Sequence, residues 1–165
     1  MGTFILDVAV YVWIIGSLAI LFGIFLQIDK SSLFTSTTWI SMGLVMDKVA
    51  PQLMAISERN PELGKNTWYV TWVFFYLLIM AVTWFWHNRR GWQLSLLSKY
   101  ILLSCVAMNV LQTSRMVDRL VFHTDYFAWL YKFGVPAINI AVVAAISISS
   151  LTAMYDWSKK KRKVA

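Results

Sequence analysis

Four long stretches with almost no charged residue constrain this chain more than any other feature. Residues 8–28, 66–86 and 133–155 carry no charge, and a weaker stretch at 94–114 contains only Lys99. As helices, at ~1.5 Å per residue, each is long enough to cross the ~30 Å hydrocarbon layer of a bilayer. Hydrophobic residues make up 59% of the 165 residues, more apolar surface than a water-soluble domain of this length hides. The sequence predicts an all-α, integral membrane four-helix bundle in a single domain, residues 1–165.

The distribution of cations predicts how this bundle is oriented. If both termini lie on the inner face, that face carries a net charge of +6, largely from Arg89, Arg90 and the basic tail 156–165, and the outer face carries +1. Cytoplasmic segments of membrane proteins are enriched in Lys and Arg. The sequence therefore predicts a multi-pass protein of a bacterial inner membrane with cytoplasmic N- and C-termini. The tail is interpreted as an anchor that attracts anionic lipid, and nucleic acid is not an expected partner.

The connection between the first two spans, residues 29–65, is predicted to be an outer loop that contains an amphipathic helix. Its apolar residues recur at intervals of three and four, so they lie on one stripe of a helix, and Asp47, Lys48 and Gln52 lie on the opposite face. Such a helix either lies on the outer membrane surface or packs across the mouth of the bundle, and it is a possible element for binding a partner. The stripe consists of Trp39, Met42, Met46, Val49, Leu53 and Ile56.

Small and amide side chains predict how the spans pack. Every fourth residue of the last span is small, a pattern that lets helix backbones approach closely in lipid, and Gly16, Ala19 and Gly23 offer a shorter match in the first span. The two spans are predicted to pack together, although self-association through the stripe is an alternative. Asn109 and Asn139 lie at the same expected depth and are predicted to hydrogen-bond. The stripe consists of Ala137, Ala141, Ala145, Ser149 and Ala153.

The segment NVLQTSRMVDRL, residues 109–120, is the most polar part of any span. A polar stripe leads from inside the bundle to the outer surface and consists of Asn109, Gln112, Arg115 and Arg119. Asp118 lies three residues after Arg115, where it is able to pair with it. One interpretation is an anchor at the membrane interface with a self-satisfied ion pair. The other is a partner-recognition patch. As candidates for that patch we take Gln112, Arg115, Asp118, Arg119, His123 and Asp125, together with Asp47 and Lys48.

No residue pattern in the chain indicates catalysis, and we expect no catalytic residue, metal or cofactor. His87 and His123 fall at opposite ends of the predicted spans, so they do not share a haem or a metal ion. Cys105 has no His or carboxylate within two helical turns that would activate it, and it is expected to be a core residue. No carboxylate lies at the centre of a span, where a proton or cation path normally places one.

These features predict a non-enzymatic membrane protein that acts by binding another membrane protein or a membrane-crossing machine on its outer face. Immunity and exclusion proteins of plasmids and phages have this size and layout, an analogy of architecture only. Two alternatives remain open: an accessory or assembly subunit of a larger membrane complex, docked through the small-residue stripe, and an oligomeric ion channel.

Overall fold

The computed structural model describes the backbone of residues 2–162 and the side chains of residues 11–159. Within residues 2–162 the chain forms five helices and no strand, which confirms the all-α prediction. They correspond to the four predicted spans and to the helix predicted between the first two. The helices are α1 (Gly2–Phe25), α2 (Lys30–Arg59), α3 (Pro61–Arg90), α4 (Leu96–Leu120) and α5 (Ala128–Arg162).

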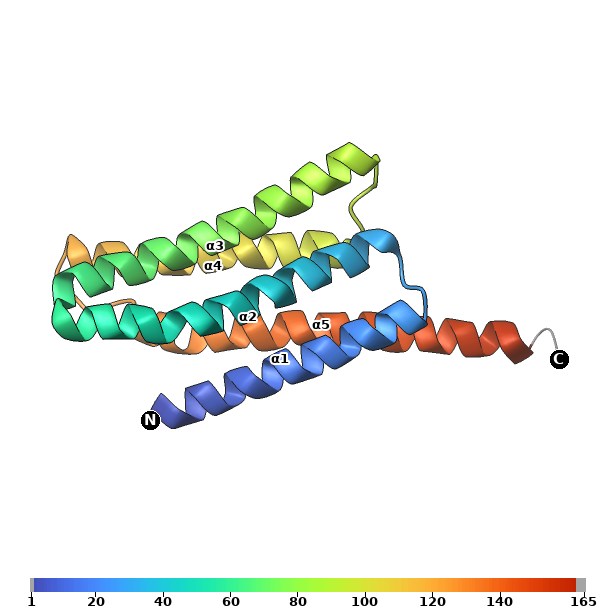
Figure 1. Cartoon of the computed structure of the whole chain (residues 1–165), viewed down its shortest axis with the longest axis horizontal. Helices are drawn as coiled ribbons and strands as arrows, with labels where there is room; N and C mark the ends of the chain where they lie inside the picture. The colour runs from blue at the N-terminus through green and yellow to red at the C-terminus, as the bar shows by residue number, and fades with distance from the viewer. Residues whose placement is uncertain (1, 163–165) are drawn as a thin grey trace.

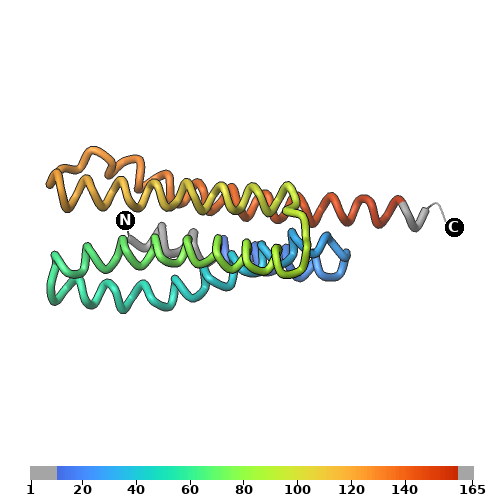
Figure 2. The backbone as a smooth tube through the Cα atoms, turned by 90° about the horizontal axis from the view of Figure 1, so that it is seen from above, coloured from blue at the N-terminus to red at the C-terminus, as the bar shows by residue number. Residues whose placement is uncertain are grey.

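Each helix runs antiparallel to the next, and the five form one elongated bundle (Figures 1 and 2). Neighbours in the chain pack side by side, α5 returns to pack against α1, and α2 also contacts α4. The connections 26–29 and 91–95 lie together at one end of the bundle, which we call the basic end. Asn60 and the connection 121–127 lie at the other, which we call the loop end.

Helix α2 corrects the expectation of an outer loop. It runs back along the bundle between α1 and α3 and does not lie across its mouth (Figure 1). At the basic end the Ser31 hydroxyl lies 2.8 Å from Nε2 of His87 and 2.9 Å from the Ser98 hydroxyl. The expected topology had put Ser31 and His87 on opposite faces. With 30 residues, α2 is ~45 Å long and therefore spans the length of the bundle.

The positions of the chain ends follow from the course of α2. Because α1 and α5 both run from the loop end towards the basic end, the chain begins at one end of the bundle and finishes at the other (Figure 1). The predicted four-span topology, with both termini on one face, assumed that the segment between the first two spans does not return along the bundle.

The predicted apolar stripe of α2 is confirmed, and the helix begins nine residues before the first member of the stripe, at Lys30. Trp39 and Leu53 are core residues, the other four members of the stripe pack against the core, and Asp47 and Lys48 are exposed. The cap is Asp29, whose carboxylate accepts from the Ser32 backbone N–H at 2.8 Å. Ser31, Ser32, Thr35 and Ser36 continue the buried face towards the basic end.

The turn between α2 and α3 is a single residue, Asn60. The Asn60 side chain accepts from the Leu63 N–H at 3.1 Å, and Pro61 occupies the first turn of α3, where it loses no hydrogen bond. Gly64 lies against α2: a Cβ atom there would be 2.2 Å from Cα of Ser57. The glycine therefore permits the close hairpin that folds α3 back along α2.

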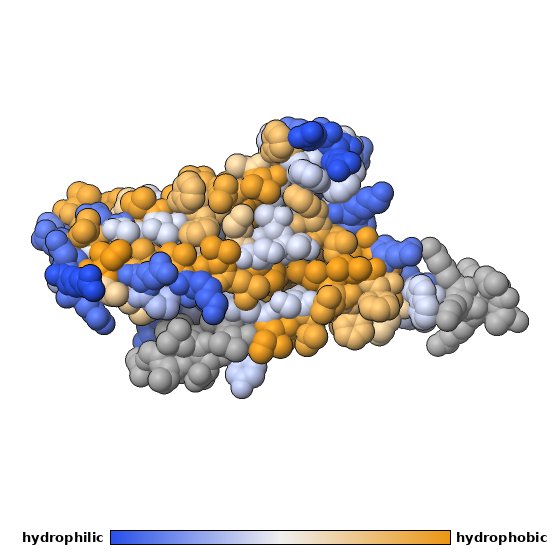
Figure 3. Space-filling view, in the orientation of Figure 1, coloured by the Kyte–Doolittle hydropathy of each residue, from blue (hydrophilic) through white to orange (hydrophobic). Residues whose placement is uncertain are grey.

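Three helices are long and apolar enough to cross a membrane: Pro61–Arg90, Leu96–Leu120 and Ala128–Lys159. They contain the predicted spans 66–86 and 133–155 and all but the first two residues of the predicted span 94–114. Of the first predicted span, 8–28, Tyr11–Phe25 is a shorter apolar helix, and residues 8–10 lie outside the described side chains. On the face seen in Figure 3, apolar residues cover most of the middle and polar residues gather towards the two ends. This pattern suits a multi-pass membrane protein.

The predicted packing of the first span on the last is confirmed by contacts between α1 and α5. The Ser150 hydroxyl donates to the backbone carbonyl of Ala19 at 2.8 Å, and a Cβ atom on Gly16 would touch Val143 at 3.4 Å. The fully buried positions of α5 are Val142, Val143, Ile146 and Ser150. The small-residue stripe is half-buried from Ala141 to Ala153, while Ala137 is exposed, so it borders the interface.

Candidate functional site

A network of charged side chains fixes the loop end of α4. Arg115 donates to the carboxylate of Asp118 at 2.5 Å and to that of Asp125 at 2.6 Å. Arg115 and Asp118 are only 6% and 1% exposed, so the pair predicted from the sequence is a buried one. Arg119 reaches Asp125 from farther away, at 3.4 Å. The guanidinium of Arg115 thus joins the end of α4 to the connection that follows it.

Asp118 also organises the connection 121–127. Its carboxylate accepts from the hydroxyl of Thr124 and from the backbone N–H of Phe127, the latter at 3.1 Å, and its backbone carbonyl accepts from the N–H of Thr124 at 2.9 Å. One buried carboxylate therefore holds the turn through which the chain enters α5. His123 adopts a left-handed backbone conformation, with φ of 54°. Its side chain is exposed and forms no hydrogen bond or ion pair with the other described residues.

The pKa of Asp125 is lowered below its ordinary value, mainly by the hydrogen bond from Arg115. The positive charges of Arg119 and Arg115 lower it further. A carboxyl group with a lowered pKa in the folded state stabilises that state above the pKa of the unfolded chain, ~4. The contribution is lost as the pH falls through the lowered value. The network is therefore intact at neutral pH.

A second layer of hydrogen bonds lies beneath the charged network. The Tyr131 hydroxyl donates to the Gln112 side-chain oxygen at 3.1 Å and accepts from the Trp68 indole N–H at 3.3 Å. Gln112 is buried. These three side chains connect α4, α5 and α3 across the bundle, and each of them also lines the space below.

That space is a cavity of about 370 Å³ to which all five helices contribute. Its walls are mostly aromatic and aliphatic. The lining residues with polar groups are Gln112, Asn139, Asp47, two tyrosines and four tryptophans. The lining residues are Trp13, Trp39, Gly43, Met46, Asp47, Ala50, Met54, Trp68, Trp72, Tyr76, Ile79, Gln112, Tyr131, Val135 and Asn139.

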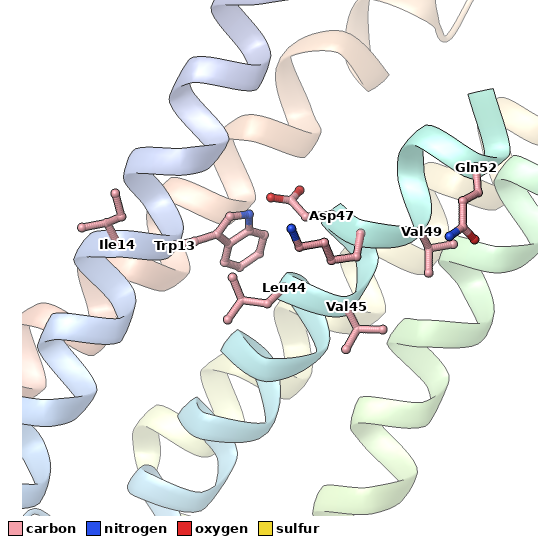
Figure 4. Close-up of a pocket in the computed structure, with 8 residues that line it drawn as sticks. Trp13, Ile14, Leu44, Val45, Asp47, Val49 and Gln52 are labelled. Carbon is pink, nitrogen blue, oxygen red and sulfur yellow. The ribbon is translucent and has the colours of Figure 1, made fainter. Parts of the chain in front are cut away.

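A groove between α1 and α2 lies beside the cavity (Figure 4). It has a volume of about 680 Å³, and its walls include Ile14 of α1 and Leu44, Val45 and Val49 of α2. Trp13 and Asp47 line both the groove and the cavity. In Figure 4 the indole of Trp13 and the carboxylate of Asp47 point towards each other across the space between the two helices. These two residues stand at the boundary between the bundle interior and its flank.

Gly43 makes the position of Trp13 possible. A Cβ atom on Gly43 would lie 2.2 Å from the Trp13 ring, so the ring rests directly on the backbone of α2. The same ring packs on Trp39, with ring centroids 5.3 Å apart. Close approach of an aromatic ring to a helix backbone requires a residue without a side chain.

The structure divides the predicted recognition patch into parts. Arg115, Asp118, Arg119 and Asp125 come together as predicted, but they bond mainly to one another. Gln112 and Asp47, which are 65 positions apart in the sequence, line the same cavity. Lys48 lies on the groove, and His123 belongs to neither.

The predicted hydrogen bond between Asn109 and Asn139 is absent among the bonds of the described residues. The side-chain oxygen of Asn109 is buried without a partner, and Asn139 faces the cavity. Equal depth along two antiparallel helices was the basis of that prediction. Depth does not fix the rotation of each helix about its axis, and the rotation separates the two amides.

A polar cluster at the basic end was not predicted. His87, which the sequence places at the end of a predicted span, is buried. Its Nδ1 donates to the backbone carbonyl of Thr83 at 2.7 Å, which leaves Nε2 to accept from Ser31. Ser98 also accepts from Thr35 and Ser95. The patterns SSLFTS and SLLS around these hydroxyls were the available signal, but pairing between separate helices is not visible in a sequence.

Comparison with known proteins gives no relative from which a function follows: no family model, curated protein or solved structure matches this chain. Among the described side chains, no group of three or more His, Cys, Asp and Glu residues is placed to hold a metal ion. The chemistry that the described groups offer is the binding of a molecule by aromatic faces, amides and one carboxylate.

Asp118→Asn tests how strongly the charged network holds the fold. We expect the substitution to lower the free energy of unfolding by about 3 kcal/mol, because it removes half of a buried ion pair. Arg119→Gln, the control, should cost less than ~1 kcal/mol because its ion pair is exposed. Thermal unfolding of the purified protein in detergent measures both. Equal effects of the two substitutions would contradict a special role for Asp118.

Proposed function

We propose that this multi-pass membrane protein acts by binding a small lipophilic molecule in the cavity between its helices, and not by catalysis. The observation that carries the proposal is the cavity itself: about 370 Å³, mainly aromatic, with a few polar groups in its walls. Sites for small molecules in proteins are typically apolar cavities of ~300–1,000 Å³ with a small number of placed polar groups.

The surroundings of the cavity suit a preformed site. The hydrogen bonds from Tyr131 to Gln112 and from Trp68 to Tyr131 hold three lining side chains in place without a ligand. Above them, Arg115 and Asp118 lock α4 to the connection that leads into α5. A site whose walls are already ordered loses little conformational entropy when it binds.

We further propose that all five helices cross the membrane, with the basic end in the cytoplasm and the loop end outside. Among residues 2–162, the basic end then carries eight cationic residues against Asp29 and Asp156, while the outer side, with Asp47 and Lys48 included, carries six cationic and six acidic residues. This asymmetry is stronger than in the four-span arrangement and follows the same rule for cytoplasmic Lys and Arg. The eight cations are Lys30, Arg89, Arg90, Lys99, Lys159, Lys160, Lys161 and Arg162.

The charged residues in the middle of α2 are compatible with this arrangement. Asp47 follows Lys30 by 17 positions, or ~26 Å along the helix. If Lys30 marks the inner boundary of a ~30 Å hydrocarbon layer, Asp47 and Lys48 lie close to the outer boundary. The remainder of α2 then projects beyond the membrane together with the start of α3.

A second candidate function is the binding of another membrane protein at the loop end. The specific support is a connection that Asp118 fixes, followed by aromatic side chains that remain exposed: Tyr126 at 85% and Trp129 at 71%. Rigid exposed aromatic residues are typical anchors of protein interfaces. Because the charges of the network satisfy one another, recognition at this end would depend on these rings more than on Arg115 or Asp118.

Labelling of single cysteines tests the five-span topology. In a Cys105→Ser background in spheroplasts, we expect Lys30→Cys to react with a membrane-impermeant maleimide only after permeabilisation, because α1 delivers residue 30 to the cytoplasmic side. Glu62→Cys should react from outside and Gln93→Cys only from inside, which controls for labelling and integrity. Reaction of Lys30→Cys in intact spheroplasts would overturn the five-span topology.

Two probes of matched shape test the cavity: phenyltrimethylammonium and its neutral isostere tert-butylbenzene. Isothermal titration calorimetry of the protein in lipid nanodiscs, with empty nanodiscs subtracted, should detect binding of at least one. Ala50→Phe fills space in the cavity wall and should weaken that binding by about tenfold or more, equivalent to ~1.4 kcal/mol. Ala55→Phe, on the exposed side of the same helix, should not. Binding of neither probe, or equal loss in both variants, would contradict the proposed function.

The second candidate is tested by replacing Tyr126 and Trp129 together with Ala. In cells treated with a crosslinker, we expect one specific membrane protein to be joined to the wild type, and to be lost from the double variant but retained by Phe25→Ala. The control removes an equally exposed ring, which is 89% exposed and lies at the other end of the bundle. If the double variant is crosslinked to the same protein as the wild type, this candidate function is wrong.

A further inference from the structure

We infer that the ligand of the cavity is a lipophilic organic cation, that Asp47 is its counterion, and that it enters from the membrane between α1 and α2. The inference rests on the proposed function and names the chemical class of its ligand and the route into the site. Four observations carry it: the charge of the lining, the aromatic faces, the environment of Asp47, and the groove.

The lining of the cavity is negatively charged. Asp47 is the only aspartate among the lining residues, which include no glutamate, histidine, lysine or arginine. An anionic ligand in the cavity would meet this carboxylate, while the neighbouring Lys48 lines the groove and not the cavity. A cation placed in the cavity gains the attraction of this carboxylate in surroundings where water does not screen it fully.

The aromatic walls favour a cation in the same way. Trp13 lies beside Trp39, with ring centroids 5.3 Å apart, and Trp68 meets Trp72 edge to face at 5.0 Å. Tyr76 and Tyr131 complete the aromatic part of the lining. The faces of such rings carry partial negative charge, tryptophan most strongly, and groups of them bind quaternary ammonium ions without a hydrogen bond.

Two polar groups face each other at the mouth of the cavity. The indole nitrogen of Trp13 is directed towards the carboxylate of Asp47 (Figure 4) and interacts with it, and the charge of Lys48 acts on the same carboxylate. Among the described residues, Asp47 nevertheless forms no ion pair within 4.0 Å. The carboxylate therefore lies at the mouth without a salt-bridge partner, where a cationic ligand would meet it.

The groove supplies a route from the membrane. Ile14, Leu44 and Val45 line it and are about half exposed on the flank of the bundle. A lipophilic cation dissolved in the membrane boundary would meet these apolar side chains first and then Trp13 and Asp47, which the groove shares with the cavity. Access through the flank lets the apolar part of the ligand stay out of water throughout its entry.

The two isosteric probes separate this inference from the proposed function. In nanodiscs, phenyltrimethylammonium should bind more tightly than tert-butylbenzene, and Asp47→Asn should reduce the ratio of their affinities by about tenfold, which corresponds to ~1.4 kcal/mol. Glu58→Gln removes an exposed charge from the same helix and should leave the ratio unchanged. Asp47→Glu should preserve the preference, which distinguishes the loss of charge from local damage.

The route is tested by Leu44→Trp, since Leu44 lines the groove but not the cavity. The bulkier side chain should slow association of phenyltrimethylammonium several-fold in stopped-flow tryptophan emission, with little change in its equilibrium affinity. An unchanged association rate would overturn entry between α1 and α2.

Equal binding of both probes with no effect of Asp47→Asn would overturn the cationic ligand, yet leave the cavity as a site for neutral molecules. If neither probe binds, the proposed function fails and this inference fails with it.

Discussion

The return of α2 through the bundle is the constraint on which the rest of the structure depends. Hydroxyl groups hold it there: Ser31 pairs with His87 and Ser98, and Thr35 also donates to Ser98. A helix with four polar side chains on one face is not an obvious partner for apolar helices. It becomes one because each buried hydroxyl that finds a partner across the interface avoids the cost of burying an unpaired polar group.

The cavity follows from the placement of α2. At the basic end the small hydroxyl side chains of α2 bond to α3 and α4, and farther along the bundle Trp13, Trp39 and Trp72 line the cavity. Gln112 and Tyr131, joined by a hydrogen bond, form its wall towards the loop end. The segment predicted to be an outer loop, residues 29–65, thus contains the helix that carries Asp47 into the wall of the cavity.

Local patterns were sufficient for local features. The 3-4 stripe on α2, the pairing of Arg115 with Asp118, and the packing of Gly16 and Ala19 against α5 all follow from helical periodicity or from small-residue spacing. The pairing of Asn109 with Asn139 failed because depth along a helix is readable from the sequence but rotation about its axis is not. The burial of His87 was missed because its partners lie in other helices.

The sequence by itself determined that this chain is helical and that most of its length is suited to lipid, because those properties depend on composition and on the spacing of neighbours. Only the tertiary structure decided that α2 belongs inside the bundle, that the two chain ends lie at opposite ends of it, and that Asp47 and Gln112 share one cavity. The physical reason is that the cost of burying a polar group depends on whether it finds a hydrogen-bond partner in the folded protein. From the sequence alone, serine and threonine indicate a loop or a surface position. Folding brings their hydroxyls together with one another and with a histidine, and these partners make burial possible.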